Sequence, residues 1–247
     1  PGLTSRPDLT GTRFPWTYSI LPQLDLSTLI DIFEVNYPLA ISRELSSFIC
    51  PTDPIGGPWT GTPGKGSSRS NYVGCFSPNG TMVDRESYTS GRWTYDTGPL
   101  TNPVTPKAIF NFNTCRRLRD VIDGTSTTVF VSETISGQGG TNDPRGVWSS
   151  DWGSQYTHMI GPNTPSPDII WSYYGSWCPS PVPPRAPCTG TGANWSDERY
   201  GARSHHTGGV HTLMGDGSVR FVSNNINLAT WQGLGSMDGG EVIGEIQ

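Results

Sequence analysis

A β-hairpin near the carboxyl end is the feature that most constrains how this chain folds. Residues 210–215 form a short apolar run, and apolar and polar side chains largely alternate in residues 218–223. This period of two is that of a half-buried strand. Asp216-Gly217 stands between the runs and is typical of a two-residue type I′ turn, whose central residues both have positive φ. The sequence therefore predicts two antiparallel strands that turn at Asp216.

Short helices and strands are expected along the rest of the chain. Between residues 24 and 36, apolar side chains follow the i, i+3, i+4, i+7 spacing of an amphipathic helix. Shorter helices are predicted at 116–122 and 227–233. Period-two patterns predict further strands at 71–76, 81–84, 91–96, 127–133, 146–151, 169–174 and 241–246.

Glycine and proline are abundant and favour long connections. They supply 31 and 22 of the 247 residues, while 9 Trp, 9 Tyr and 8 Phe exclude general disorder. We expect one globular domain over residues 1–247, of the α+β class, with an antiparallel sheet, short helices and long Gly/Pro-rich loops. The longest loop insertions are expected at about 54–70 and 160–200.

The charge of the chain excludes one class of partner. The net charge is −5, and the two lysines, Lys65 and Lys107, belong to no basic run. Nucleic-acid binding depends on neutralising phosphates with clustered basic side chains, so we expect no nucleic-acid partner. The sequence also has no apolar stretch long enough to span a bilayer.

Six segments share their content and order with one known family. They are Trp16–Leu24, Phe48–Pro54, Asn71–Gly74, Leu118–Glu133, His206–Gly217 (a histidine, nine residues, then Asp-Gly), and Trp231–Gly235 with Gly240–Val242. Together they resemble the boxes of the large DUF1559 family, which abounds in planctomycetes and carries an H-X9-DG box. Two positions depart from the family pattern: Gln23 stands where an aromatic residue is usual, and Thr127 replaces the usual asparagine.

The resemblance implies a protein similar to type IV pilins or type II secretion pseudopilins, with a pilin-like antiparallel domain. Family members begin with a prepilin leader and a long apolar helix, so we expect this sequence to be the globular part of a longer protein. Contact with a membrane is expected only through that helix. The resemblance further implies a non-enzymatic structural subunit that assembles, with copies of itself or other envelope proteins, into an extracellular filament or envelope-associated complex. The family motif residues are His206, Asp216 and Gly217 in this sequence.

Five cysteines bear on the location of the protein. Cys178 and Cys188 bracket a proline-rich loop, and the stiffness of this loop favours a disulfide at its base. We expect Cys75 and Cys115 to form a second disulfide. Cys50 is then left over: it either pairs with a cysteine of the helix that the resemblance implies or is a buried free thiol. Disulfides indicate an extracytoplasmic location, at the cell surface, secreted or periplasmic.

Two asparagines fit the acceptor pattern for N-glycosylation. Asn79 and Asn194 each begin an N-x-[ST] sequence, and this pattern favours surface loops.

Histidines and carboxylates in and after the hairpin are candidate metal ligands. His206, His211 and Asp216 offer imidazole and carboxylate groups that suit Zn²⁺. The alternative is that Asp216 stabilises its own turn and that His206 bonds nearby backbone. Asp238 and Glu241 form a carboxylate pair where pseudopilins hold Ca²⁺, and turn formation is again the alternative. We expect no resident cofactor, with Ca²⁺ as the alternative.

The sequence offers no recognisable pattern of catalytic residues. A hydrolase needs a nucleophile beside a base, or paired carboxylates, and neither pattern is found. We therefore expect no enzymatic activity.

Aromatic residues crowd the segment between 148 and 195. Such rings belong to a core, to an assembly interface or to a platform on which a glycan stacks. The third alternative supports a second hypothesis, an extracytoplasmic solute- or glycan-binding module. The residues concerned are Trp148, Trp152, Trp171, Tyr173, Tyr174, Trp177 and Trp195.

Overall fold

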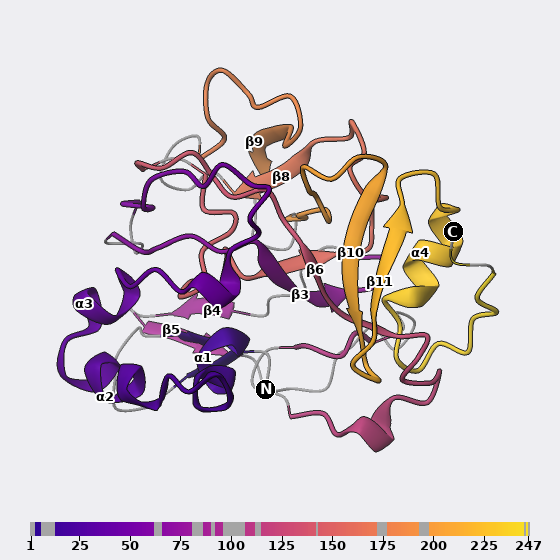
Figure 1. Ribbon diagram of the computed structural model, residues 1–247, viewed down its shortest axis with the longest axis horizontal. Helices are drawn as coiled ribbons and strands as arrows, with labels where there is room; N and C mark the ends of the chain where they lie inside the picture. The colour runs from indigo at the N-terminus through magenta and orange to yellow at the C-terminus, as the bar shows by residue number, and fades with distance from the viewer. Residues whose placement is uncertain are drawn as a thin grey trace.

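A five-stranded sheet forms the centre of the fold in the computed structural model (Figure 1). Its strands, in spatial order, are β11 (Val219–Ser223), β10 (Gly209–Met214), β6 (Val129–Glu133), β3 (Tyr72–Ser77) and β7 (Gln155–Thr157). The structure describes residues 3–5, 13–61, 66–80, 86–89, 92–95, 107–111, 115–141, 143–171, 177–192, 198–244 and 246.

Short helices flank this sheet. In the view of Figure 1, α1 (Trp16–Ile20), α2 (Ser27–Val35) and α3 (Tyr37–Ile41) lie to the left of the sheet, and α4 (Leu228–Leu234) lies beyond β11. Three 3₁₀ turns are η1 (Leu21–Leu24), η2 (Ser46–Phe48) and η3 (Leu118–Asp120). Among the described residues, no helix has the length and apolar character needed to cross a membrane.

Three small two-stranded sheets complete the described secondary structure. They pair β1 (Leu3–Ser5) with β2 (Arg13–Pro15), β4 (Glu86–Thr89) with β5 (Arg92–Tyr95), and β8 (Asp168–Trp171) with β9 (Cys188–Gly192).

The α+β class is confirmed, and one strand departs from the antiparallel expectation. β11, β10, β6 and β3 pair antiparallel, whereas β7 runs parallel to β3. The chain between β3 and β7 is long, and a parallel neighbour requires such a crossover rather than a tight turn. The central sheet is therefore mixed.

The carboxyl-terminal hairpin forms as predicted, but its turn differs from the type I′ prediction. β10 and β11 pair in register, with Leu213 opposite Val219. Gly217 donates its N–H to the carbonyl of Met214 at 3.0 Å and has a φ of 86°, whereas Asp216 has no positive φ. This is a three-residue loop closed by a left-handed glycine. Such a loop needs positive φ only at the glycine, so Asp216 keeps an ordinary backbone conformation.

Two predicted strands are wrong. Residues 146–151 form a bend and turns with one isolated bridge at Val147, because Gly146 adopts a left-handed φ of 65° that keeps a strand from starting there. Residues 241–244 also form no strand. The glycine amides just before them bind the Asp123 carboxylate instead, at 2.8 Å from Gly239 and 2.9 Å from Gly240. The strand predicted at 81–84 lies outside the described residues.

Tryptophans from the aromatic segment belong to the core. Trp148, Trp152 and Trp177 are buried. Trp177 packs edge-on against Trp152, with ring centroids 5.2 Å apart, and Trp148 packs edge-on against Phe33 at 5.6 Å. Edge-to-face pairs of this kind stabilise a core beyond the area they bury. The structure does not describe the side chains of the other four residues in this set, Trp171, Tyr173, Tyr174 and Trp195.

One of the two predicted disulfides is present. Cys178 and Cys188 are bonded across the proline-rich loop. The predicted pair Cys75–Cys115 is wrong, because Cys75 points into the core from β3 while Cys115 is exposed. Burial raises the pKa of the Cys75 thiol well above its ordinary value. Cys75 is therefore a packed, neutral core residue.

Candidate functional site

Asn71 joins two distant segments at the start of β3. Its side-chain oxygen accepts the backbone N–H of Cys50 at 2.8 Å, and its amide nitrogen donates to the carbonyl of Thr134 at 3.1 Å. The same nitrogen donates to the carboxylate of Asp53. Asn71 is almost fully buried. A single buried amide therefore fixes the Cys50–Asp53 turn against the end of β6.

Glu133 is the last residue of β6, and its carboxylate is buried. It pairs in register with Tyr72 of β3. Oε2 accepts the backbone N–H of His211 at 2.7 Å and lies 3.5 Å from Nδ1 of the same histidine. Oε1 lies 3.0 Å from Nε2 of His206. A strand end thus presents one carboxylate to two imidazoles.

His206 is positioned by the segment that leads into β10. Arg203, three residues earlier, is buried and held by the Asp168 carboxylate at 2.8 Å. The Ser204 hydroxyl accepts the backbone N–H of His206 at 3.2 Å and donates to the carbonyl of Gly209 at 2.8 Å. These bonds place the imidazole over the end of β6.

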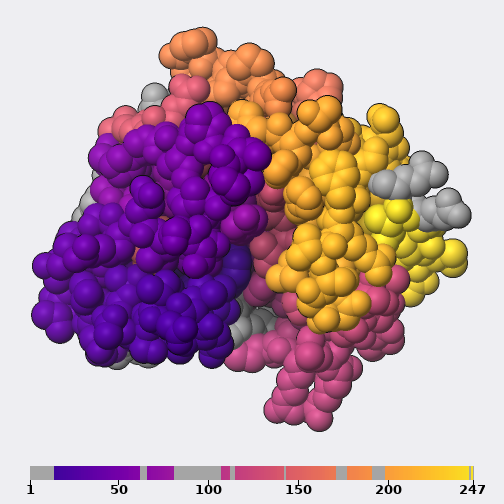
Figure 2. Space-filling model, viewed as in Figure 1, coloured from indigo at the N-terminus to yellow at the C-terminus, as the bar shows by residue number. Residues whose placement is uncertain are grey.

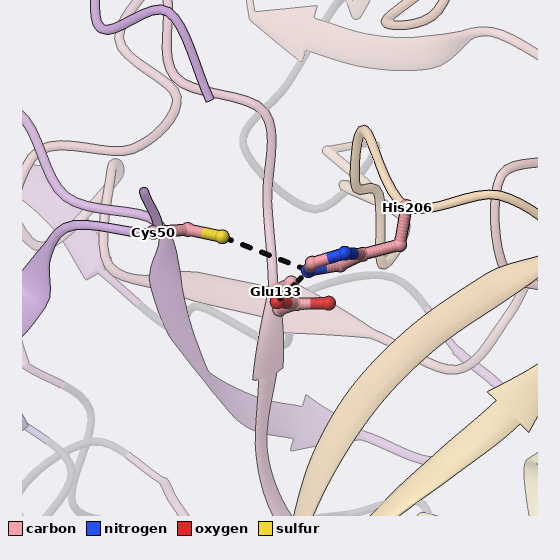
Figure 3. A group of neighbouring side chains, drawn as sticks. All are labelled: Cys50, Glu133 and His206. Carbon is pink, nitrogen blue, oxygen red and sulfur yellow. Dashed lines mark hydrogen bonds and ion pairs between the residues drawn. The ribbon is translucent and has the colours of Figure 1, made fainter. Parts of the chain in front are cut away.

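Cys50 completes a cluster of three side chains, Cys50, Glu133 and His206 (Figure 3). Its sulfur lies 3.6 Å from Nε2 of His206 and 3.1 Å from Oγ1 of Thr52. One ligand atom from each of the three side chains lies within 4.8 Å of the other two. Cys50 and Glu133 are buried, and His206 is partly exposed. The cluster therefore brings a thiol, a carboxylate and an imidazole together at one accessible point.

A second acid–histidine pair lies on the same loops. Nε2 of His205 is 3.3 Å from Oδ1 of Asp53, and the side chain of Asp53 is only 5% exposed. The other carboxylate oxygen, Oδ2, also accepts the backbone N–H of Ser136 at 2.9 Å. Neighbouring histidines therefore each face a buried acid.

An apolar groove opens beside the cluster. It has a volume of about 560 Å³ and is lined by α1, η1, the Cys50 turn and strands β3, β6, β10 and β11. Figure 2 shows a hollow between the indigo-to-purple amino-terminal segments and the orange hairpin. Glu133, His206 and His211 supply polar groups, and the remaining lining is largely apolar. The lining includes Trp16, Ile20, Leu24, Tyr72, Val131, Leu213 and Val219.

The cluster lacks the geometry of a catalytic triad. In a nucleophile–base–acid relay, the nucleophile contacts one ring nitrogen of the histidine and the acid contacts the other. Here Cys50 and Glu133 both contact Nε2 of His206. The two side chains therefore converge on one atom, and this arrangement suits binding a cation better than relaying a proton.

The structure brings two of the predicted metal ligands, His206 and His211, side by side but leaves Asp216 apart from them. Asp216 lies in the turn after β10, whereas His206 precedes that strand, so the hairpin separates them. Asp216 instead accepts the N–H of Ser218 at 2.8 Å and its hydroxyl at 2.6 Å. This is the turn-stabilising role considered as its alternative. His211 reaches Glu133, and this carboxylate was absent from the predicted set.

The structure does not place the second predicted pair, Asp238 and Glu241, in a metal site either. Asp238 forms an ion pair with Lys107 at 2.6 Å. Glu241 is exposed, and its carboxylate oxygens lie against the backbone of Gly239. No group of three candidate ligands includes either residue within the described part of the chain. Of the predicted glycosylation sites, Asn79 is exposed and Asn194 lies outside the described residues.

Comparison with known proteins identifies the family to which the chain belongs. Residues 1–229 match the family model described as "Protein of unknown function (DUF1559)". The chain belongs to this family. No curated protein and no solved structure matches it. Cys50, Glu133 and His206 come from three different segments that carry the sequence resemblance, and Asn71, which anchors the backbone of Cys50, comes from a fourth.

The convergence of Cys50 and Glu133 on His206 was not predicted from the sequence. The available signal is that these residues lie in segments that carry the sequence resemblance, since Glu133 ends one segment and Cys50 lies within another. That signal gives no distance, because 156 positions separate Cys50 from His206.

Proposed function

We propose that this protein is a non-enzymatic, pilin-like structural subunit, and that its apolar groove takes an apolar helix of the assembly. The observation that carries the proposal is the groove itself, whose lining is apolar along most of its extent. Membership of the DUF1559 family supports it, through the pilin-like nature that the sequence resemblance implies.

One wall of the groove has the spacing of a helix ridge. Trp16, Ile20 and Leu24 are four residues apart along α1 and η1, and all three line the groove. On α1, Trp16 and Ile20 have the i, i+4 spacing of the ridges that interdigitate when two α-helices pack, and Leu24 extends the same wall at the end of the 3₁₀ helix η1. The opposite wall is the sheet, with Val131 and Leu213 on neighbouring strands. A helix would therefore meet a helix on one side and a sheet on the other, as in helix-in-groove recognition.

The rim of the groove leaves apolar surface in water. Val219 lines the groove and is 65% exposed. Its neighbour Phe221 on the same strand is 44% exposed, and β11 is an edge strand among the described elements. Contiguous apolar surface beside an edge strand is typical of an interaction site.

An extracytoplasmic location is part of this proposal. The Cys178–Cys188 disulfide supports it, because disulfides form and persist mainly in oxidising compartments.

The polar end of the groove favours a second candidate, a binding module for an apolar solute with a polar head group. A volume of about 560 Å³ falls within the range of small-molecule sites, which combine apolar walls with a few convergent polar groups. Glu133, His206 and His211 would face the head group. Trp148, Trp152 and Trp177 do not contribute to this candidate, because they are core residues.

Electron microscopy and native mass spectrometry of the protein isolated from its native source distinguish the two candidates. Polymers, or complexes that contain several copies or other subunits, are expected for the structural role. Discrete monomers that carry a bound small molecule would instead support the solute-binding role and overturn the first proposal.

A matched pair of variants tests the groove directly. Val219→Asp places a charge in the groove at a largely exposed position, whereas Val242→Asp places one at a residue that is 97% exposed and is not among the lining residues. We expect assembly to be lost in the first variant and kept in the second. Equal assembly of both variants would exclude the groove as the contact.

A further inference from the structure

We infer that Cys50, Glu133 and His206 form a binding site for a zinc-class divalent cation at the polar end of the groove. The cluster is made of three ligand types whose donor atoms face one another across at most 4.8 Å. It stands whether the groove holds a helix or a solute, because all three ligands belong to the chain itself.

Two acceptor groups, the Cys50 sulfur and the Glu133 carboxylate, contact the same ring nitrogen of His206. A single ring nitrogen holds at most one hydrogen, so Nε2 donates to only one partner. Both the Cys50 sulfur, at 3.6 Å, and Oε1 of Glu133, at 3.0 Å, lie against this one atom. A cation resolves the conflict, because a nitrogen lone pair, a thiolate and a carboxylate all direct electron density toward it.

The burial of the Glu133 carboxylate also supports a cation site. The buried carboxylates of Asp143 and Asp168 each pair with a buried guanidinium, at 2.8 Å and 2.6 Å from Arg145. Among the described residues, Glu133 has no lysine or arginine at ion-pair distance, and its partners are imidazoles and one backbone N–H. Burying a carboxylate without a cationic partner is costly. A bound divalent cation would supply the missing charge.

The spacing and the ligand types identify the class of cation. With Zn–S of about 2.3 Å and Zn–N of about 2.0 Å, two ligands of a tetrahedral zinc ion lie about 3.5 Å apart. The sulfur–nitrogen distance of 3.6 Å matches this edge, whereas the nitrogen–oxygen distance of 3.0 Å has to widen slightly. Calcium prefers a shell made of oxygen atoms, so a thiol and an imidazole favour zinc.

The surroundings hold the ligands in place before a cation arrives. Asn71 fixes the backbone N–H of Cys50, and Glu133 is pinned by the backbone N–H of His211. His211 packs its ring edge-on against His206, with centroids 4.6 Å apart. A tetrahedral ion takes four ligands, so three protein ligands leave one coordination position free. His211 and the groove both lie beside the cluster. Either this imidazole or a group in the groove can therefore complete the coordination.

Cobalt absorption spectroscopy tests the site without reference to any activity. The chain is purified without a histidine tag, reduced, freed of metal with a chelator and titrated with Co²⁺. Wild type is expected to bind one equivalent, with a near-ultraviolet band from thiolate-to-cobalt charge transfer and visible bands of tetrahedral intensity. Addition of Zn²⁺ should displace the cobalt and abolish both. Absence of cobalt binding by the folded wild-type chain would overturn the inference.

Variants assign the ligands. Cys50→Ser is expected to lose the charge-transfer band, and Cys115→Ser, which removes an exposed free thiol, is expected to keep it. Changes to residues that merely orient a metal ligand weaken binding by about 10- to 100-fold, so Glu133→Gln and His206→Ala should weaken it by about 100-fold or more. His205→Ala is the histidine control and should bind as wild type does. A charge-transfer band that survives in Cys50→Ser, or is lost in Cys115→Ser, would contradict the assignment.

Discussion

Nε2 of His206 lies 3.0 Å from Oε1 of Glu133, although 73 positions separate the two residues in the sequence. The contact joins the end of β6 to the segment that leads into β10. The Cys50 side chain points toward the same nitrogen from a different segment of the chain (Figure 3). The fold therefore brings Cys50, Glu133 and His206 to one point, beside an apolar groove.

Asn71→Ala should destabilise the fold strongly. The substitution removes bonds to the Cys50 amide, the Asp53 carboxylate and the Thr134 carbonyl, and it leaves buried polar groups unsatisfied. Each such group costs about 1–3 kcal/mol, so we expect a loss of about 3 kcal/mol in the free energy of unfolding. Urea denaturation measures it. Asn225→Ala changes an exposed asparagine and should have almost no effect; similar losses in both variants would contradict the role of Asn71.

Asp168→Asn should disrupt the anchor of the His206 segment. Asp168 is fully buried and bonds Arg145 at 2.6 Å and Arg203 at 2.8 Å. Removal of one partner from a buried ion pair costs about 3–5 kcal/mol, because a charge is left unpaired. Denaturation in urea should show a loss of this size. Asp120→Asn is the control, since its pair with Arg119 is exposed and should contribute less than about 1 kcal/mol.

His158 should make the fold sensitive to acid. Burial lowers its pKa to about 3, although a hydrogen bond to the Trp231 carbonyl opposes this shift. The unfolded chain protonates this histidine near pH 6.5 and the folded chain does not, so stability is lost as the pH falls from about 6.5 toward 3. Between pH 6 and 4, wild type should lose about 1.4 kcal/mol per pH unit more than His158→Gln does. Denaturation at several pH values measures the difference, and equal slopes would show that His158 does not carry it.

The Cys178–Cys188 disulfide should contribute measurably to stability. It closes a loop between residues ten positions apart, and both sulfurs belong to the main core. The chain-entropy relation gives about 3 kcal/mol for a loop of this length. Thermal or urea unfolding of the double variant Cys178→Ala/Cys188→Ala should show this loss. Cys115→Ser should change stability by less than about 0.5 kcal/mol, because Cys115 is exposed and unbonded. A large loss in that variant would revive the rejected Cys75–Cys115 bond.

Local patterns predicted the parts of this fold that local interactions decide. The hairpin and α2 follow from alternation and from helical spacing, and the Cys178–Cys188 disulfide follows from a stiff loop between two nearby cysteines. The type I′ turn was wrong because Asp216-Gly217 also fits a longer loop that needs positive φ at Gly217 alone.

The cluster was missed because it depends on the order of strands in the sheet. The sequence predicts His206 as a metal ligand together with His211 and Asp216. The fold keeps His211 beside His206, leaves Asp216 in its turn, and brings Glu133 from the neighbouring strand β6 to His206 instead. The sequence around Cys50 or Glu133 does not predict their contacts with His206, because His206 lies 156 and 73 positions away from them.

Photo-cross-linking from the groove tests the central claim most directly. A benzophenone amino acid replaces Val219 in the protein made by its native source, and cross-linked peptides are identified by mass spectrometry. A matched probe at Val242, which lies outside the groove lining, reports background contacts. The account predicts that the Val219 probe captures an apolar helical segment of another copy or subunit, and that the Val242 probe does not. If both probes give the same products, or Val219 gives none, the groove is not the site of assembly.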